Sequence, residues 1–90
     1  MSEMKLYVMS ISTDEMFDAI MNKTADGLVS MLKGMSGFVG VHNAEYFHAF
    51  LFTSPEARNK AQEKAQEMGY KTAAQMIDAA YVDIGEAFGK

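Results

Sequence analysis

The sequence contains no cysteine and no tryptophan, and it has one proline and one arginine among 90 residues. The lack of cysteine excludes disulfides, thiol catalysis and thiolate metal sites, and it favours a reducing compartment such as the cytoplasm. The first residues, MSEMKLYVM, carry charges where a signal peptide would be apolar, and no later run reaches the ~18 apolar residues of a membrane span. We therefore expect a cytoplasmic protein without a membrane segment.

Positive charge is also scarce. Eight Lys and Arg residues stand against 12 Asp and Glu residues, so the net charge is −4. Nucleic-acid binding draws its affinity from clustered Lys and Arg that displace counterions from phosphates, and this chain has no such cluster. The composition argues against a nucleic-acid partner. It leaves open an acidic inhibitor or adaptor that docks on a basic partner.

The remaining composition is that of a small globular protein. Hydrophobic residues make up 49% of the chain and charged residues 22%, which predicts a single domain over residues 1–90. A domain of this size buries a small core, and association with a partner often supplements its stability.

The first half of the chain predicts one strand and one long helical segment. Residues 4–12 are rich in strand formers, and Thr13 is a candidate N-cap followed by two acids. Apolar side chains then recur at spacings of three and four: Phe17, Ile20, Met21, Thr24, Leu28, Met31, Leu32 and Met35. Gly27 permits a break between residues 22 and 27, and Gly34 is expected to end the helix.

The second half predicts a hairpin, a helix and a last strand. Residues 37–43 and 45–53 form the hairpin, and residues 54–69 form a helix with Ser54 as N-cap and Pro55 at its first position. Residues 79–84 are the expected last strand. The order strand, helix, strand, strand, helix, strand predicts an α+β protein of the ferredoxin-like βαββαβ type, with a four-stranded antiparallel sheet and two helices on one face.

The other face of that sheet is the candidate functional surface. A hairpin loop of two or four residues pairs Val41 with His48 and Val39 with Phe50. We expect the helix side to take His48, Phe50 and Phe52, together with Leu6 and Val8; a loop of three or five residues would change the second hairpin strand. The outward residues would be Tyr7, Met9, Ile11, Phe38, His42, Phe47, Leu51 and Tyr81. Such a patch exceeds what a soluble monomer usually exposes, so it predicts a homodimer interface or a ligand surface.

Residues 6–11, LYVMSI, resemble the first strand of the RNA-recognition motif. The third strand of that family begins with a basic residue and a glycine and carries two base-stacking aromatics. Here the corresponding positions hold Glu45, Tyr46, Phe47 and Ala49. An RNA-binding domain therefore remains an alternative that lacks the basic residue, the glycine and the second stacking aromatic of that family.

Residues 36–41, SGFVGV, and 52–57, FTSPEA, are similar to segments of the dimeric α+β barrel proteins. The resemblance implies a ferredoxin-like fold whose open sheet faces pair in a homodimer. Cofactor-free monooxygenases belong to this family, but the tryptophan that they use is absent here, so the activity is not carried over. A cofactor-free enzyme or a binding protein for a small apolar molecule, with His42 or Tyr7 as its polar handle, is the alternative.

The two histidines, His42 and His48, flank the hairpin turn. They are expected on opposite faces, and no third ligand stands at a matching spacing, so we predict neither a metal site nor a cofactor. Asp78 and Asp83 are five residues apart, across the expected last strand, and would also face opposite ways, so they do not form an acid pair. The sequence therefore favours a non-catalytic interaction protein that homodimerises.

Overall fold

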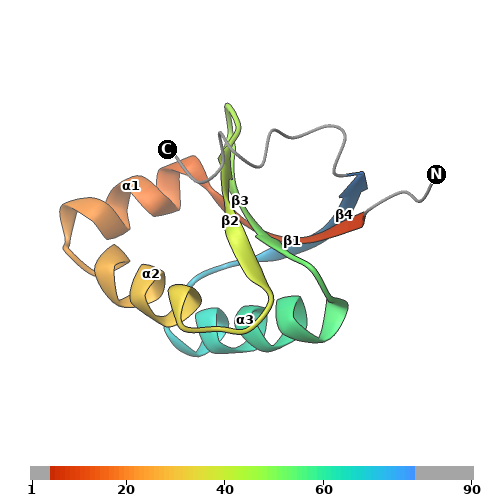
Figure 1. The fold of residues 1–90 in the computed structure, drawn as a ribbon. Coiled ribbons are helices and arrows are strands. Elements are labelled where there is room, and N and C mark those ends of the chain that lie inside the picture. Colours follow the sequence, from red (N-terminus) through yellow and green to blue (C-terminus); the bar gives the residue numbers. More distant parts are fainter. Residues whose placement is uncertain (1–4, 79–90) are drawn as a thin grey trace.

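A computed structural model of the chain describes residues 5–78. The elements are, in order, β1 Lys5–Ser12, α1 Thr13–Met21, α2 Ala25–Lys33, β2 Phe38–Asn43, β3 Phe47–Phe52, α3 Pro55–Glu67 and β4 Ala73–Asp78 (Figure 1). The strands form one antiparallel sheet in the order β2-β3-β1-β4. The predicted α+β class and four-stranded antiparallel sheet are confirmed. The prediction of two helices is wrong, because the described chain contains three.

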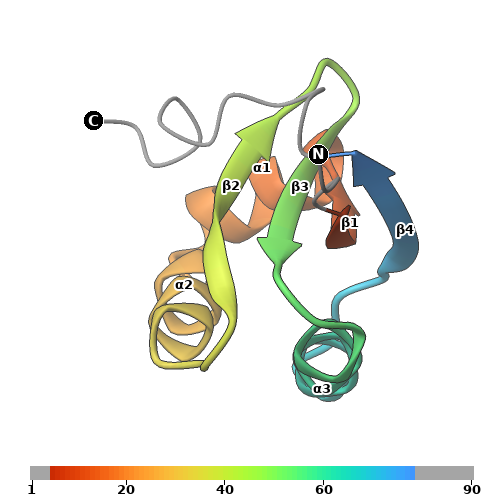
Figure 2. The same cartoon turned by 45° about the vertical axis from the view of Figure 1, so that its right-hand side comes forward.

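The helices cover one face of the sheet (Figures 1 and 2). All three contribute to the main core cluster, in which Leu28 and Leu32 of α2 meet Phe50 and Phe52 of β3. A second cluster consists only of strand residues. The sheet therefore has a helix-covered face and a second face over which the described chain places no helix.

The extra helix arises from a break at the predicted place. α1 ends at Met21, and Lys23 adopts the left-handed backbone conformation with φ of 62° before α2 begins at Ala25. The start of α1 differs by one residue from the prediction. The side chain of Ser12, not Thr13, accepts a hydrogen bond from the backbone N–H of Glu15, at 3.1 Å, and so acts as the N-cap.

α3 follows the sequence signals closely. Ser54 caps it by accepting a hydrogen bond from the backbone N–H of Ala57, at 3.1 Å, and Pro55 occupies the first helical position. Ala61 and Ala65 are fully buried against the sheet. Because alanine leaves no long side chain between the two layers, the helix backbone packs close to the strands.

The last described strand is not where the sequence predicted it. β4 covers Ala73–Asp78, whereas the predicted strand at residues 79–84 lies outside the described residues. β4 pairs with β1 along its whole length, and the Lys5 ammonium lies 2.6 Å from the Asp78 carboxylate. Alanine and glutamine have low strand propensity, so the local sequence does not predict this strand and pairing with β1 determines its conformation.

The only arginine joins α3 to the sheet. The guanidinium of Arg58 donates hydrogen bonds to the backbone carbonyls of Val8 at 3.3 Å and Gln75 at 3.0 Å, and it lies 5.9 Å from the centre of the Tyr7 ring. These contacts link β1 and β4 to the helix layer. Arg58, the only arginine in the sequence, therefore has a structural role.

Candidate interaction surfaces

The orientation of β1 is opposite to the prediction. Met9 pairs with Phe50, and both belong to the helix-side core, whereas Leu6 and Val8 belong to the second cluster. Directly opposed residues of antiparallel strands share a face, so the position of Phe50 fixes that of Met9. The prediction was wrong for Tyr7, Met9 and Ile11, which pack on the helix side. The side chains that β1 turns to each face are mainly apolar. The sequence alone therefore does not show which face of β1 points to the helices.

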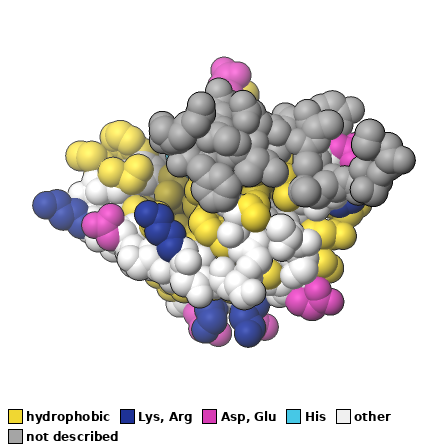
Figure 3. Space-filling view, in the orientation of Figure 1, with side chains coloured by type: hydrophobic (Ala, Val, Ile, Leu, Met, Phe, Trp, Pro, Cys, Tyr) yellow, Lys and Arg dark blue, Asp and Glu magenta, His cyan; other side chains and the backbone are white. Residues whose placement is uncertain are grey.

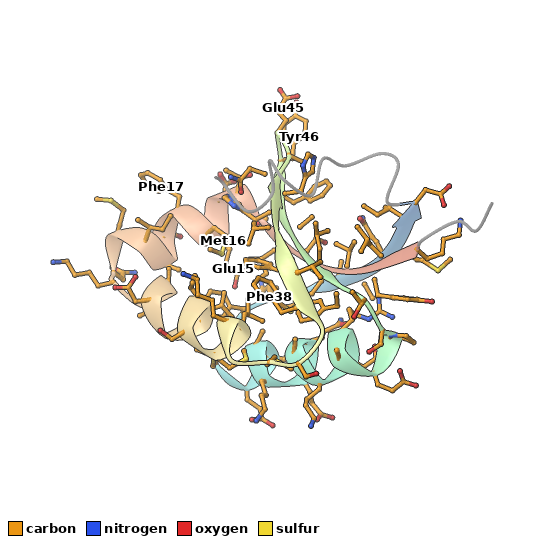
Figure 4. The ribbon with its side chains drawn as sticks, viewed as in Figure 1. Glu15, Met16, Phe17, Phe38, Glu45 and Tyr46 are labelled. Carbon is orange, nitrogen blue, oxygen red and sulfur yellow. The ribbon has the colours of Figure 1, made fainter. Side chains whose placement is uncertain are left out.

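The hairpin turn lies one residue later than predicted, and β2 contains an irregularity. Val41 pairs with Phe50, not His48, and the register shifts between Phe38 and Gly40. This shift turns Phe38 to the helix side (Figure 4). Its ring lies 5.4 Å from the ring of Phe52. The predicted outward position of Phe38 is therefore wrong.

We call the strand-only cluster the second face. It contains the buried residues Leu6, Val8, Ala49 and Leu51 and the partly buried residues Val39, Phe47 and Ile77. Phe47 and Leu51 lie there as predicted. His42 lies on this face too, because it pairs with Ala49. Tyr81, the remaining predicted member, lies outside the described residues.

The two histidines occupy opposite faces, as predicted. His48 pairs with Ile11, a residue of the helix-side core, whereas His42 belongs to the second face. Burial lowers the pKa of His48 below its usual value, because the charged imidazolium loses solvation. The neutral form of His48 is therefore favoured in the folded protein.

Several hollows lie on the helix side of the molecule. One, of about 430 Å³, is lined mostly by polar and small residues between α2 and α3: Gly34, Met35, Ser36, Ser54, Glu56, Ala57 and Lys60. A second, of about 210 Å³, is lined by residues of α1, of the break after it and of the end of α3: Glu15, Asp18, Ala19, Asn22, Thr24, Met68, Gly69 and Tyr70. A third is apolar, has a volume of about 120 Å³, and is lined by Val29, Leu32, Lys33, Phe38, Gly40, Val41 and Phe50. None of these includes Tyr7 or His42, the polar groups that the sequence suggested for a ligand site.

α1 presents an exposed apolar surface that the sequence did not predict. Phe17, Ile20 and Met21, which we call the α1 ridge, are 61%, 57% and 64% exposed. Figure 3 shows hydrophobic side chains protruding at this end of the molecule, and Figure 4 shows Phe17 pointing away from the sheet. The buried residues of α1 are instead Met16 and Ala19.

The exposure of Phe17 and Ile20 has a physical cause. One helix from Thr13 to Met35 would place them on the same face as Leu28 and Leu32, but the chain breaks at residues 22–24. The break allows α1 and α2 to point different faces at the sheet. Only α2 buries the predicted stripe.

The tip of the hairpin is fastened beside the start of α1. The backbone N–H of Thr13 donates to the carbonyl of Tyr46 at 2.9 Å, and the Thr13 hydroxyl donates to the carbonyl of Glu45 at 3.3 Å. The Tyr46 side chain is 75% exposed. Thr13 is one helical turn from Phe17, about 6 Å along the axis, so the hairpin tip lies at the N-terminal end of α1.

Within residues 5–78, no three His, Asp and Glu residues are arranged to hold a metal ion. No helix in this range is long and apolar enough to cross a membrane.

Comparison of the chain with protein-family models, with curated proteins and with solved structures gave no match.

Proposed function

We propose that this chain is a small interaction protein without chemistry of its own, which homodimerises through the second face of a ferredoxin-like domain. The observation that carries the proposal is a cluster of apolar residues from all four strands, on the face over which the described chain places no helix; Val39, Phe47 and Ile77 are its partly exposed members. The strand order β2-β3-β1-β4 supports a ferredoxin-like arrangement in which the first helix has split into two. The cytoplasmic location expected from the lack of cysteine belongs to the same proposal.

The partly buried members of the second face are the groups that a second copy would contact. Val39, Phe47 and Ile77 come from β2, β3 and β4, and His42 adds a polar group on the same face. Leu6, Val8 and Leu51 have no exposed area left to contribute. A stable interface usually buries about 800 Å² per partner, and the fully buried members of the second face cannot contribute to that area. We therefore expect a weak dimer whose population rises with concentration.

The ligand-binding alternative has less support. Sites for small organic molecules usually enclose roughly 300 to 1,000 Å³ and are mainly apolar. The apolar hollow beside Phe38 has a volume of about 120 Å³. The hollow of about 430 Å³ between α2 and α3 is lined mostly by polar and small residues. An interaction surface is therefore the better supported function.

Phe47→Asp tests the dimer. In a two-fold interface the substitution places a carboxylate on both partners, so we expect a folded monomer at concentrations where the unchanged chain is dimeric. Sedimentation velocity measures the mass, and circular dichroism reports whether the fold is kept.

His42→Glu serves as a second variant, because His42 is only half-buried and carries a polar side chain, so its replacement spares the core. Phe17→Asp is the matched control, since it places the same charge on the helix side. A dimer that survives both Phe47→Asp and His42→Glu, or a chain that is monomeric at every concentration, would contradict the proposal.

A further inference from the structure

The α1 ridge reverses the usual arrangement of a surface helix. Ile20 and Met21 follow Phe17 by three and four residues, so the three side chains form one continuous stripe. They are more than half exposed, whereas Met16 and Ala19 on the sheet side are 5% exposed. A helix normally buries its large apolar residues and exposes polar ones. An exposed apolar stripe of this kind is typical of a surface that binds a partner.

Carboxylates flank one side of the stripe. Asp14 and Asp18 are exposed on α1 along this side, and the exposed Lys23 lies two residues beyond Met21 at the opposite end of the helix. Figure 4 shows Glu45 and Tyr46 together at the hairpin tip, apart from Phe17. The helix dipole also favours negative charge at the N-terminal end of α1. The surface therefore combines apolar anchoring area with an acidic rim on one side, formed by Asp14 and Asp18.

We propose that the α1 ridge binds a basic amphipathic helical segment of another protein. Apolar side chains at every third or fourth position of such a segment would lie along Phe17, Ile20 and Met21. Its Lys and Arg residues would pair with Asp14 and Asp18. The whole chain carries a net charge of −4, which further attracts a cationic partner.

Two other occupants fit the surface less well. A second copy of this chain would bring its own carboxylates and the same net negative charge to the contact. An anionic membrane surface would be repelled by the acidic rim. The α1 ridge lies on the helix side of the sheet, so the inference is independent of the dimer proposed through the second face.

A fluorescent peptide provides the test on the full chain. The probe is a synthetic helix of about 14 residues with leucine on one face, lysine on the flanks and a single tryptophan among the leucines. Because the protein has no tryptophan, emission from that residue reports only on the peptide. We expect a saturable blue shift of the emission, and a Kd that rises severalfold when NaCl is increased from about 0.05 to 0.5 M.

A matched pair of methionine variants locates the binding surface. Met21 and Met76 are 64% and 57% exposed, but only Met21 belongs to the α1 ridge. We expect Met21→Ser to weaken binding by about threefold or more and Phe17→Ser by about tenfold or more, because the apolar contact area is lost. Met76→Ser should bind the peptide as the unchanged chain does. All three side chains are exposed, so the fold should be kept.

Several results would overturn the inference. One is equal binding by the Phe17→Ser variant and the unchanged chain, and another is an equal loss in Met76→Ser. A peptide whose lysines are replaced by glutamines should bind several times more weakly, and equal binding would contradict the role of the acidic rim. A loss of dimer mass in Met21→Ser would assign the ridge to a second copy instead.

Discussion

α1 and α3 begin in the same way but use opposite kinds of side chain against the sheet. Each is capped by a serine that accepts a hydrogen bond at 3.1 Å from the backbone N–H three residues later. α3 buries the small residues Ala61 and Ala65 and exposes polar ones, whereas α1 exposes Phe17, Ile20 and Met21. α3 thus meets the ordinary requirement of a folded core. α1 carries more apolar surface than its own packing uses.

The difference indicates which helix serves the fold and which serves a partner. Leaving large apolar side chains in water forgoes about 1.5 to 3 kcal/mol for each one that could have been buried. The break at residues 22–24 separates α1 from α2. The α1 ridge can therefore point outward while α2 turns its own apolar face to the sheet. The substitutions below separate the two roles, starting with the largest expected change in stability.

Ala61→Leu should have the largest effect. Ala61 is fully buried between α3 and the sheet, so a larger side chain forces the two layers apart. We expect a loss of about 2 kcal/mol in the free energy of unfolding, measured by urea denaturation. Lys64→Leu, on the exposed side of the same helix, is the control and should change stability by less than about 0.5 kcal/mol. Equal effects of the two variants would show that α3 does not pack as described.

Removing the caps should have a smaller and nearly equal effect on the two helices. Ser12→Ala and Ser54→Ala each delete one side-chain acceptor that satisfies a backbone N–H. We expect each to lower the free energy of unfolding by about 1 kcal/mol. Ser12→Thr and Ser54→Thr keep a hydroxyl and should lose less. A negligible effect at Ser12 alone would mean that α1 is not held at its N-terminus as α3 is.

His48 should add a modest dependence of stability on pH. Burial lowers its pKa in the folded state, so the unfolded chain takes up the proton first as the pH falls. The neutral form of His48 contributes fully to the free energy of unfolding above the ordinary histidine pKa of about 6.5. This contribution is lost as the pH falls from there through the lowered pKa of the folded state. We expect His48→Gln to show a flatter fall in the urea midpoint between about pH 7 and pH 5.5.

His42→Gln is the matched variant for this measurement, because it replaces the other histidine of the hairpin. An identical pH slope in His48→Gln and in the unchanged chain would contradict a buried, neutral His48. The comparison of slopes, rather than of single values, removes any change in stability that the substitution causes at all pH values.

Local signals in the sequence predicted much of the fold. Ser54 and Pro55 mark the start of α3 because capping and a fixed φ depend only on neighbouring residues. The break near residue 22 and the end of α2 at Gly34 were predicted for the same reason. The α+β class followed from the order of the elements.

The remaining errors concern relations between distant residues. The face that β1 turns to the helices depends on its pairing with β3, and the position of Phe38 depends on the irregularity in β2. β4 forms through pairing with β1, although its alanines do not favour a strand. The candidate surface was therefore predicted on the correct face for Phe47, Leu51 and His42, but on the wrong face for Tyr7, Met9, Ile11 and Phe38. The α1 ridge was missed because its residues resemble core residues.

The most direct test of the contrast between α1 and α3 is the stability of the triple variant Phe17→Gln, Ile20→Gln, Met21→Gln. These side chains contribute little to the core, so the free energy of unfolding from urea denaturation should stay within about 1 kcal/mol of that of the unchanged chain. A loss of more than about 3 kcal/mol would show that the three residues are needed to fold the chain, and that the α1 ridge is not a surface held for a partner.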